Sequence, residues 1–479
     1  MLLSFTVSNF RSFREEQTFS MVASNRHADH PEHLSPIPDD DNKVLPVAAI
    51  YGANGAGKTN LIKALHFFKT LVAQGIRPDE TISQQPFRLD KTSKDAPTEF
   101  DVQFVEDGRV YRYGVRFTEK FVQAEWLSLV RNSKEINVFE RVTNEAGESK
   151  VESGPVLKDA TWGDHKIVMA LASIGVRQNQ LFLNTIRQTV DTAQQGPVIQ
   201  SAMNWFTKKI AIVGAQVTFE NLAELIAKDP TFTEFAGRFL RHVATGVDML
   251  HTEEIDVDER MILGGGLSPV VQEALGALGT GDTTVIPAPD GLSQLIVEKG
   301  EGAKVRVRTM ISEHITEDGD RVNFSFGEES DGTQRLIHLL PALHSLRSFP
   351  CIFIIDEIDR SLHPLLSKCF VREFLKLCAG KGSQLIFTTH DTAFLDLDLL
   401  RRDEIWFTEK KSGKGATELY SLAEFKVRTD LKIDKGYMQG RFGGVPPSQT
   451  EFPEWVNEII KELKPRSGGD GNKSNESTQ

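Results

Sequence analysis

The amino-acid sequence predicts an α/β protein built on a mixed or mainly parallel sheet, and two features carry this prediction. The first is a regular alternation of apolar strand patterns and amphipathic helix patterns over residues 332–421. The second is a glycine-rich loop at 52–59 that stands between an apolar strand pattern and a helical one. Strands that alternate with helices usually pair in parallel, because each helix crosses back over the sheet before the next strand begins.

The composition is that of a globular protein. Of its 479 residues, 39% are hydrophobic and 25% are charged, which suits two or three domains. The net charge of −12 weighs against a broad surface for non-specific nucleic-acid binding, although a local basic groove stays open.

The sequence also bears on where the protein works. No apolar run approaches the roughly 20 residues that span a bilayer, so we expect no membrane association. The N-terminus alternates like a strand rather than a signal peptide, and the three cysteines lack the spacing of a disulfide framework. We therefore expect a cytoplasmic protein.

Patterning divides the chain into two lobes, an insertion and a tail. We expect an N-terminal lobe over 1–195 with an antiparallel β subdomain, in which an Asp-Gly turn at 107–108 indicates a hairpin. Residues 196–290 show mostly helical apolar spacing and predict a mainly helical insertion. A C-terminal lobe is expected over 291–464, and residues 465–479, with almost nothing to bury, are expected to be disordered.

The strongest motif is GANGAGKT at 52–59, a full match to the phosphate-binding pattern G-x-x-x-x-G-K-[ST]. Glycines let consecutive N–H groups turn toward phosphate at the N-terminus of the following helix. Lys58 is expected to reach the β- and γ-phosphates, and Thr59 to place its hydroxyl on Mg²⁺. The predicted nucleotide-binding residues here are Gly52, Asn54, Gly55, Gly57, Lys58, Thr59 and Asn60.

Two later strands end in residues that suit the other half of a nucleotide site. CIFIIDE at 351–357 is an apolar strand that ends in Asp356, expected to hold Mg²⁺, and Glu357, expected to polarise the attacking water. QLIFTTH at 384–390 ends in His390, interpreted as a sensor of the γ-phosphate. Asp356 lies 298 residues after Lys58 (356 − 58), so a long segment is inserted between the two halves.

The order of the motifs supplies a resemblance. The strand with NFRSF at 9–13 comes first, followed by the phosphate loop, a long insertion, a signature, DEID at 356–359 and the strand-end histidine. This order resembles the ABC-type ATPase heads of the RecF/SMC group. The signature of those heads is S-G-G-Q, and SDGTQR at 330–335 stands in its place, with Ser330, Gly332 and Gln334 matching.

This variant signature narrows the resemblance. Together with YMQGRFGGVP at 437–446, it resembles the subgroup named "AAA family ATP-binding protein", found in bacterial phage-defence and abortive-infection systems. The resemblance implies an ABC-type P-loop ATPase head that hydrolyses ATP with Mg²⁺ and acts as a switch in phage defence. It also implies a separate effector, a nuclease or toxin, and leaves nucleic acid open as a partner.

The same resemblance implies a homodimer, or a higher oligomer, that closes head to head around ATP. One copy's phosphate loop then holds ATP, while Ser330, Gly332 and Gln334 of a second copy contact it. Arg11 is expected to contact the nucleotide. Gln188, at the end of LFLNTIRQ, is expected to coordinate Mg²⁺ and water.

Two other functions are weighed against this switch. A RecF-like DNA-repair ATPase would share the motifs, whereas an SMC-like tether needs a long heptad repeat, which residues 197–276 lack. The nucleotide-binding subunit of a membrane transporter is disfavoured by the strand-rich layout with its long insertion.

Two polar stretches raise further questions. His27, His30 and His33 recur every third residue in a loop rich in Pro and Asp, but no strong fourth ligand is apparent and we expect no metal there. In the acidic stretch before the signature helix, Ser330 or Asp331 is expected to cap the helix. Asp331 replaces a signature glycine and should repel a γ-phosphate, so we expect dimer closure to be weak or conditional.

Overall fold

The computed structural model describes residues 1–445 with internal gaps. The positions outside the description are 78, 163–164, 215–218, 220, 256–275, 277, 280, 289–292, 301–304, 347–348, 412–414, 427–431 and 446–479. The predicted tail at 465–479 therefore lies outside the described residues.

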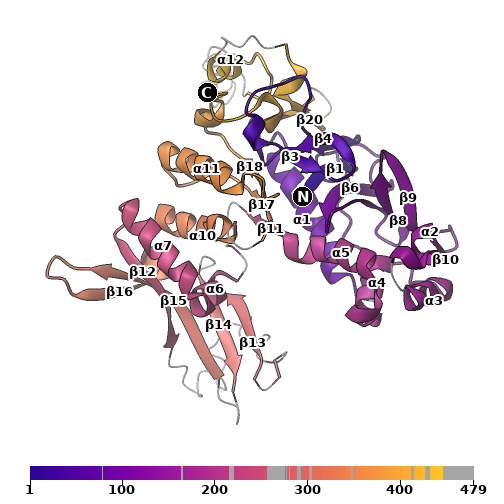
Figure 1. Ribbon diagram of the computed structural model, residues 1–479, viewed down its shortest axis with the longest axis horizontal. Helices are drawn as coiled ribbons and strands as arrows, with labels where there is room; N and C mark the ends of the chain where they lie inside the picture. Colours follow the sequence, from indigo (N-terminus) through magenta and orange to yellow (C-terminus); the bar gives the residue numbers. More distant parts are fainter. Residues whose placement is uncertain are drawn as a thin grey trace, which may run out of the picture.

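A six-stranded, mainly parallel sheet forms the centre of the molecule (Figure 1). Its order is β11-β17-β18-β5-β19-β20, and only β20 runs antiparallel to its neighbour. The strands span Val47–Tyr51 (β5), Ile210–Val213 (β11), Ile352–Ile355 (β17), Gln384–Thr388 (β18), Ile405–Lys410 (β19) and Thr417–Ser421 (β20). The predicted α/β class and the predicted C-terminal strands are confirmed.

Both faces of the central sheet are buried, as a parallel sheet requires. Along β5, Ala48 and Ile50 face one hydrophobic core, and Val47, Ala49 and Tyr51 face another. Helix α1 (Lys58–Gln74) packs in the first core, and α10 (Asp331–Ser345) and α11 (Pro364–Cys378) pack in the second. The sequence predicted these three helices to within a few residues.

The first core is closed by a seven-stranded antiparallel sheet of order β10-β9-β8-β7-β6-β1-β2, the predicted N-terminal β subdomain. Its strands are Leu2–Ser8 (β1), Gln17–Ser20 (β2), Thr98–Glu106 (β6), Arg109–Phe117 (β7), Val122–Arg131 (β8), Lys134–Thr143 (β9) and Ser149–Ser153 (β10). The predicted Asp-Gly hairpin at 107–108 joins β6 to β7.

Short elements complete this lobe. They are the strands Ser35–Ile37 (β3) and Asp40–Val44 (β4), the helices Pro155–Lys158 (α2), Lys166–Ile174 (α3), Phe182–Thr189 (α4) and Pro197–Asn204 (α5), and a π-helical turn at Trp205–Lys209. A last helix, Ile433–Met438 (α12), follows β20.

The insertion corrects the prediction of a mainly helical segment over 196–290. Helices α6 (Leu222–Lys228) and α7 (Pro230–His242) lie against a separate antiparallel sheet that extends beyond 290. The strands of that sheet are Val247–Ile255 (β12), Thr283–Pro287 (β13), Gln294–Lys299 (β14), Val305–Ile315 (β15) and Arg321–Ser325 (β16). Strand β11 belongs to the central sheet, so the insertion begins after it. The residue pattern over 292–326 indicates strands, and β14, β15 and β16 lie there. The helical expectation missed β12 and β13, and the partner of β12, strand β15, is distant in sequence.

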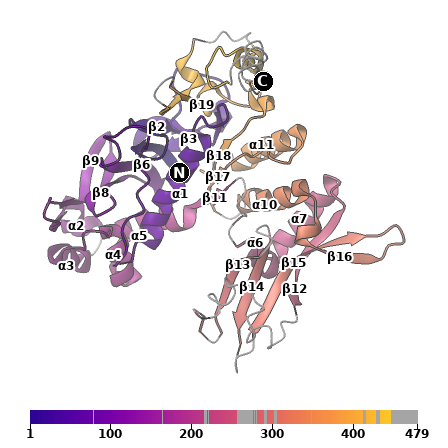
Figure 2. The same cartoon turned by 180° about the vertical axis from the view of Figure 1, so that it is seen from behind.

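Figures 1 and 2 show the insertion sheet projecting from the rest of the molecule on the side of α10. Helix α10 is the shared wall, since Leu339 and Leu343 pack in the core of the central sheet while Leu336 and Leu340 pack in the core of the insertion. The helix that carries the signature is therefore buried on two sides. Among the described helices, none is long and apolar enough to cross a membrane.

Candidate nucleotide-binding site

The phosphate loop joins β5 to α1 at the carboxyl edge of the central sheet. Gly52 and Gly57 have φ angles of 158° and 119°, and a Cβ at these positions would collide with Thr408 of β19 and Thr417 of β20, respectively. Packing therefore requires glycine at both. Gly55, with φ of 77°, has open space where a Cβ would lie. The crest of the loop thus faces free volume.

The N-terminus of α1 is prepared for an anion. No side chain caps it, and its first turn contains no acidic residue. Lys58, the first residue of the helix, turns back over the loop and donates from Nζ to Gly52 O at 2.7 Å and to Ala53 O at 3.4 Å. An uncapped helix end together with an ammonium group is a favourable place for phosphate.

Charged groups from three strand ends share one environment. Burial lowers the pKa of Lys58, and Asp356, Glu357 and Asp359 partly offset that effect. Burial and the charge of Lys58 lower the pKa of His390, against the opposite influence of the same three carboxylates. The structure thus brings together residues from the ends of β5, β17 and β18, as the sequence predicted.

The two carboxylates after β17 are held differently. Thr388 of β18 donates from its hydroxyl to Asp356 Oδ1 at 2.6 Å and accepts from the backbone N–H of Glu357 at 2.7 Å. Glu357 has a left-handed φ of 49°, a costly conformation for a non-glycine residue that clusters at functional sites. Its carboxylate, half-buried, has no hydrogen-bond partner among the described residues.

Arg335 ties the signature helix to this strand end. It is buried, and it donates to Asp356 O at 2.7 Å, to Glu357 O at 3.1 Å and to Gly214 O at 3.1 Å. Burial lowers its pKa to about 10, with a further lowering from Arg360. The guanidinium remains charged at neutral pH, and it fixes the backbone that carries Asp356 and Glu357.

The signature itself lies at the surface. Ser330 is the N-cap of α10 and accepts from Thr333 N at 3.2 Å, which confirms the predicted capping. Gly332 packs so closely that a Cβ would come within 2.8 Å of Ser361 O. Gln334 is buried and donates to Glu329 O at 2.8 Å. Ser330 and the following residue, Asp331, remain exposed.

Three carboxylates lie at the start of α10: Glu328, Glu329 and Asp331. The first two accept hydrogen bonds from nearby side chains. Glu328 accepts from the N–H and hydroxyl of Ser325 at 2.7 and 2.8 Å. Glu329 binds Ser312 at 2.5 Å and His314 at 2.6 Å, both on β15. Asp331 is left as the acidic group that faces outward from the signature.

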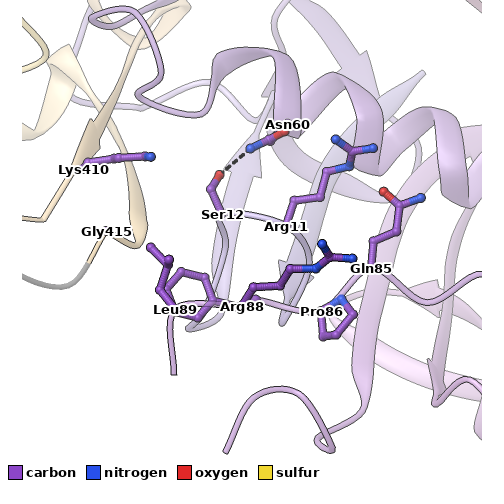
Figure 3. Close-up of a pocket in the computed structure, with 10 residues that line it drawn as sticks. Arg11, Ser12, Asn60, Gln85, Pro86, Arg88, Leu89, Lys410 and Gly415 are labelled. Carbon is purple, nitrogen blue, oxygen red and sulfur yellow. Dashed lines mark hydrogen bonds between the residues drawn. The ribbon is translucent and has the colours of Figure 1, made fainter. Parts of the chain in front are cut away.

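A pocket of about 520 Å³ adjoins the loop (Figure 3). Its ten lining residues are Arg11, Ser12, Asn60, Gln85, Pro86, Phe87, Arg88, Leu89, Lys410 and Gly415. Asn60 of α1 donates to Ser12 Oγ at 2.7 Å, and Thr417 donates to Ala56 O of the loop at 2.8 Å. The pocket therefore lies beside the first turn of α1, which follows the phosphate loop.

The cations of this pocket include the predicted nucleotide contact. Figure 3 shows Arg11 and Arg88 on one side and Lys410, from β19, on the other. Burial and the charge of Arg88 lower the pKa of Arg11, whose Nε lacks a hydrogen-bond partner within the described part of the chain. A buried guanidinium nitrogen without a partner fits a site for an anionic ligand.

The structure does not support the prediction for Gln188. This residue is exposed on α4, a helix joined to α1 by the bond from Asn184 to Val72 O at 3.0 Å. Val72 lies fourteen residues beyond Lys58 (72 − 58), which is about 21 Å along a helix at 1.5 Å per residue. Gln188 is therefore far from the phosphate loop, because α4 packs against the C-terminal end of α1 and the loop precedes its N-terminal end.

Sequence reasoning did not assign roles to several residues that shape the site. Thr388 positions Asp356 and Glu357, and Arg88 and Lys410 line the pocket. Thr388 could have been suspected from its place two residues before His390 on the same strand. Nothing local in the sequence predicts that Arg88 and Lys410 meet.

A model of one protein family matches most of the chain. A family model described as "AAA domain, putative AbiEii toxin, Type IV TA system" matches residues 47–396, which contain the phosphate loop, the insertion and all three strand ends. No curated protein matches.

Solved structures that resemble the chain include SMC heads. The SMC head domain from Thermotoga maritima is 14% identical with a TM-score of 0.34, covering 88% of this chain and 98% of that one. An Smc head from Pyrococcus furiosus with an extended coiled coil, bound to the C-terminal domain of ScpA, is 13% identical with a TM-score of 0.34, covering 96% and 99%. An Smc head bound to the C-winged helix domain of ScpA is 12% identical with a TM-score of 0.39, and the match covers 88% of this chain and 97% of that one.

Proposed function

The chain belongs to the AAA-domain family whose description reads "putative AbiEii toxin, Type IV TA system". Because this is a family of nucleotide-binding domains, we propose that the chain hydrolyses ATP. The observation that carries the proposal is the meeting of Lys58, Asp356, Glu357 and His390 at one edge of the central sheet. A phosphate-binding loop, a carboxylate for the metal and a carboxylate for water are the parts that phosphoryl transfer to water requires.

The residues fit Mg²⁺ and a nucleoside triphosphate. Thr59 and Asp356 would hold the metal, since a hydroxyl and a carboxylate oxygen suit this hard cation. Mg²⁺ supplies charge neutralisation at the β- and γ-phosphates when bound. Gly52, Asn54, Gly55, Gly57 and Asn60 would present backbone and side-chain donors. Arg11 would contact the nucleotide from the adjoining pocket.

The chain's own groups then divide the chemistry. Glu357, fixed at its N–H by Thr388 and at its carbonyl by Arg335, would accept a proton from the attacking water. Lys58 would leave its contact with Gly52 O and stabilise the charge that develops on the transferred group. His390 has a lowered pKa, so it would meet the phosphate as a neutral donor.

We further propose that the complete site forms between two copies of the chain. Ser330 and Asp331 are exposed. This placement supports a signature that acts on the nucleotide of a second copy, with Ser330 and Gly332 offering donors at the N-terminus of α10.

The test of hydrolysis is Glu357→Gln. Loss of the base should lower phosphate release by about 10²–10⁴-fold while ATP binding is kept, and an ATP-bound dimer should accumulate in size-exclusion chromatography. Glu373→Gln is the matched control, because Glu373 pairs with Lys376 on the surface of α11. Undiminished turnover in Glu357→Gln would refute the assignment of the base.

The biological role we propose is phage defence through a separate effector. The family description, which names a toxin of a toxin–antitoxin system, favours this role over DNA repair. Phage plating efficiency should fall in cells that carry the protein with its neighbouring genes and recover with Glu357→Gln. A RecF-like function predicts instead ATP-dependent DNA binding that weakens steeply with salt.

A further inference from the structure

A second polar cluster lies outside the nucleotide site, in the loop between β2 and β5. One ring nitrogen each of His30 and His33 and a carboxylate oxygen of Glu32 lie within 4.8 Å of one another. Glu32 and His33 belong to a 3₁₀ turn at Pro31–His33, and His30 is the residue immediately before it. Because residues three apart eclipse in such a turn, the two imidazole rings stack, with centroids 4.8 Å apart.

The hydrogen bond that His30 donates from Nε2 leaves its Nδ1 facing the carboxylate of Glu32. Its Nε2 lies 2.8 Å from Leu397 O, and a carbonyl oxygen can only accept, so Nε2 carries the proton. In the neutral ring Nδ1 is then a lone pair, and it faces Glu32 Oε1 at 3.1 Å. Two acceptors at this distance repel each other unless a cation or a second proton lies between them.

His33 is oriented in a matching way. Its Nδ1 lies 2.9 Å from Oε1 of Glu404, a fully buried carboxylate that also accepts from Arg401 N at 2.7 Å. With Nδ1–H donated to Glu404, the lone pair is on Nε2, for which no hydrogen-bond partner exists among the described residues. A carboxylate or backbone carbonyl that holds the far N–H of a histidine is the usual outer partner of a metal-ligating imidazole.

We propose that His30, Glu32 and His33 bind a divalent transition metal of the Zn²⁺ class. Two imidazoles and one carboxylate form a ligand set that Zn²⁺ uses with a fourth position left for water. The 3.1 Å between His30 Nδ1 and Glu32 Oε1 is close to the about 3.3 Å that separates two ligands of tetrahedral Zn²⁺. The proposal is independent of ATP hydrolysis.

The position of the cluster indicates what the metal does. The loop is fastened to the segment between β18 and β19 by His30 to Leu397, by His33 to Glu404 and by Ser24 N to Asp403 at 2.8 Å. A bound metal fixes the two ring orientations on which two of these contacts depend. It therefore acts as a clip that holds the loop against the segment that follows His390.

Solvent can reach the site. The side chain of Glu32 is 64% exposed, against 21% for His30 and 9% for His33. The metal enters from the side of Glu32, while the outer partners of both imidazoles lie toward the protein. The sequence alone did not favour a metal here, because the orienting groups, Leu397 and Glu404, lie 367 and 371 residues after His30 and His33.

The test is Zn²⁺ binding by the full-length chain after EDTA treatment, measured against a chromophoric competitor. Excess Mg²⁺ is present so that the oxygen ligands of the nucleotide site are occupied. The wild type should bind one equivalent and should melt at a higher temperature with Zn²⁺ than without it. Co²⁺ should give visible absorption bands typical of nitrogen and oxygen ligands.

Glu32→Gln is the decisive variant, because this exposed side chain contacts only His30 among the described residues and its change should leave the fold intact. It should weaken Zn²⁺ binding by at least about tenfold, as should His30→Gln and His33→Gln. His27→Gln, in the same loop but outside the cluster, should bind as the wild type does.

Three outcomes would overturn the proposal. One is a wild type that binds no Zn²⁺ at tens of micromolar, which would mean that a proton bridges His30 and Glu32. Another is equal weakening by His27→Gln, which would indicate adventitious histidine binding. The last is a Glu32→Gln variant with the wild-type melting temperature, affinity and Co²⁺ spectrum.

Discussion

The phosphate loop and the signature are two halves of one predicted site, and the structure treats them differently. The base of the loop packs against its own chain, with Thr408 against Gly52 and Thr417 against Gly57, while the crest at Gly55 is open. Asp356, Glu357 and His390 share the electrostatic environment of Lys58. The signature lies at a surface, where Ser330 caps its own helix and Asp331 faces outward.

If the proposed two-copy site is right, a single chain already orients Asp356 and Glu357, and the signature of a second copy is needed to complete the site. The costly conformation of Glu357 is held by Thr388 and Arg335 in the single chain. Arg335 belongs to the signature helix, so a movement of α10 would reach the backbone of Asp356 and Glu357 directly. We infer that the signature contacts a second copy and that, through Arg335, it also adjusts the positions of Asp356 and Glu357 in its own chain.

The largest effect is expected from mixing two inactive variants. Lys58→Ala should abolish ATP binding, and Ser330→Arg should block a second copy's site while it leaves its own loop intact. If the signature acts across the dimer, a mixture should regain about a quarter of the wild-type turnover, because half of the dimers have one intact site. Absence of recovery at any mixing ratio would place the signature on its own chain's nucleotide.

A smaller effect is expected at the link between the halves. Arg335→Met removes three hydrogen bonds to buried carbonyl oxygens and should lower the free energy of unfolding by on the order of 3 kcal/mol. Urea denaturation measures this change, and Arg372→Met, exposed on α11, is the control. Turnover should also fall at temperatures where the variant is folded. A variant with wild-type turnover would show that Arg335 has only a packing role.

The smallest effect is expected at Asp331. If its carboxylate repels the γ-phosphate, Asp331→Gly should strengthen ATP-driven dimerisation by a few fold, with the increase largest at low ionic strength. Analytical ultracentrifugation with ATP in the Glu357→Gln background measures the dimer. Glu328→Gln is a nearby control, since Glu328 is engaged by Ser325. Equal dimerisation and turnover with and without Asp331 would remove the conditional-closure idea.

The correction at Gln188 also has a consequence. Gln188→Ala, far from the loop, should leave ATP turnover unchanged. A residue that follows β11 is better placed, since β11 pairs in parallel with β17 and ends at the same edge of the central sheet.

The sequence by itself determined the local parts of this protein. The phosphate loop, the strands ending in Asp356 and His390, the capping by Ser330 and the β6–β7 hairpin all depend on residues close together along the chain. Periodicity and short motifs report such local requirements well. They also sufficed to predict the α/β class, because alternating strands and helices admit few arrangements.

Only the tertiary structure decided which distant residues meet. The described part of the insertion contains a sheet behind α6 and α7 because β12 pairs with β15, a long-range pairing set by cross-strand contacts and not by local propensity. Gln188 is removed from the nucleotide site by the docking of α4, and the histidines of the loop gain their orientation from Leu397 and Glu404. Contacts across hundreds of residues depend on packing, which no local pattern encodes.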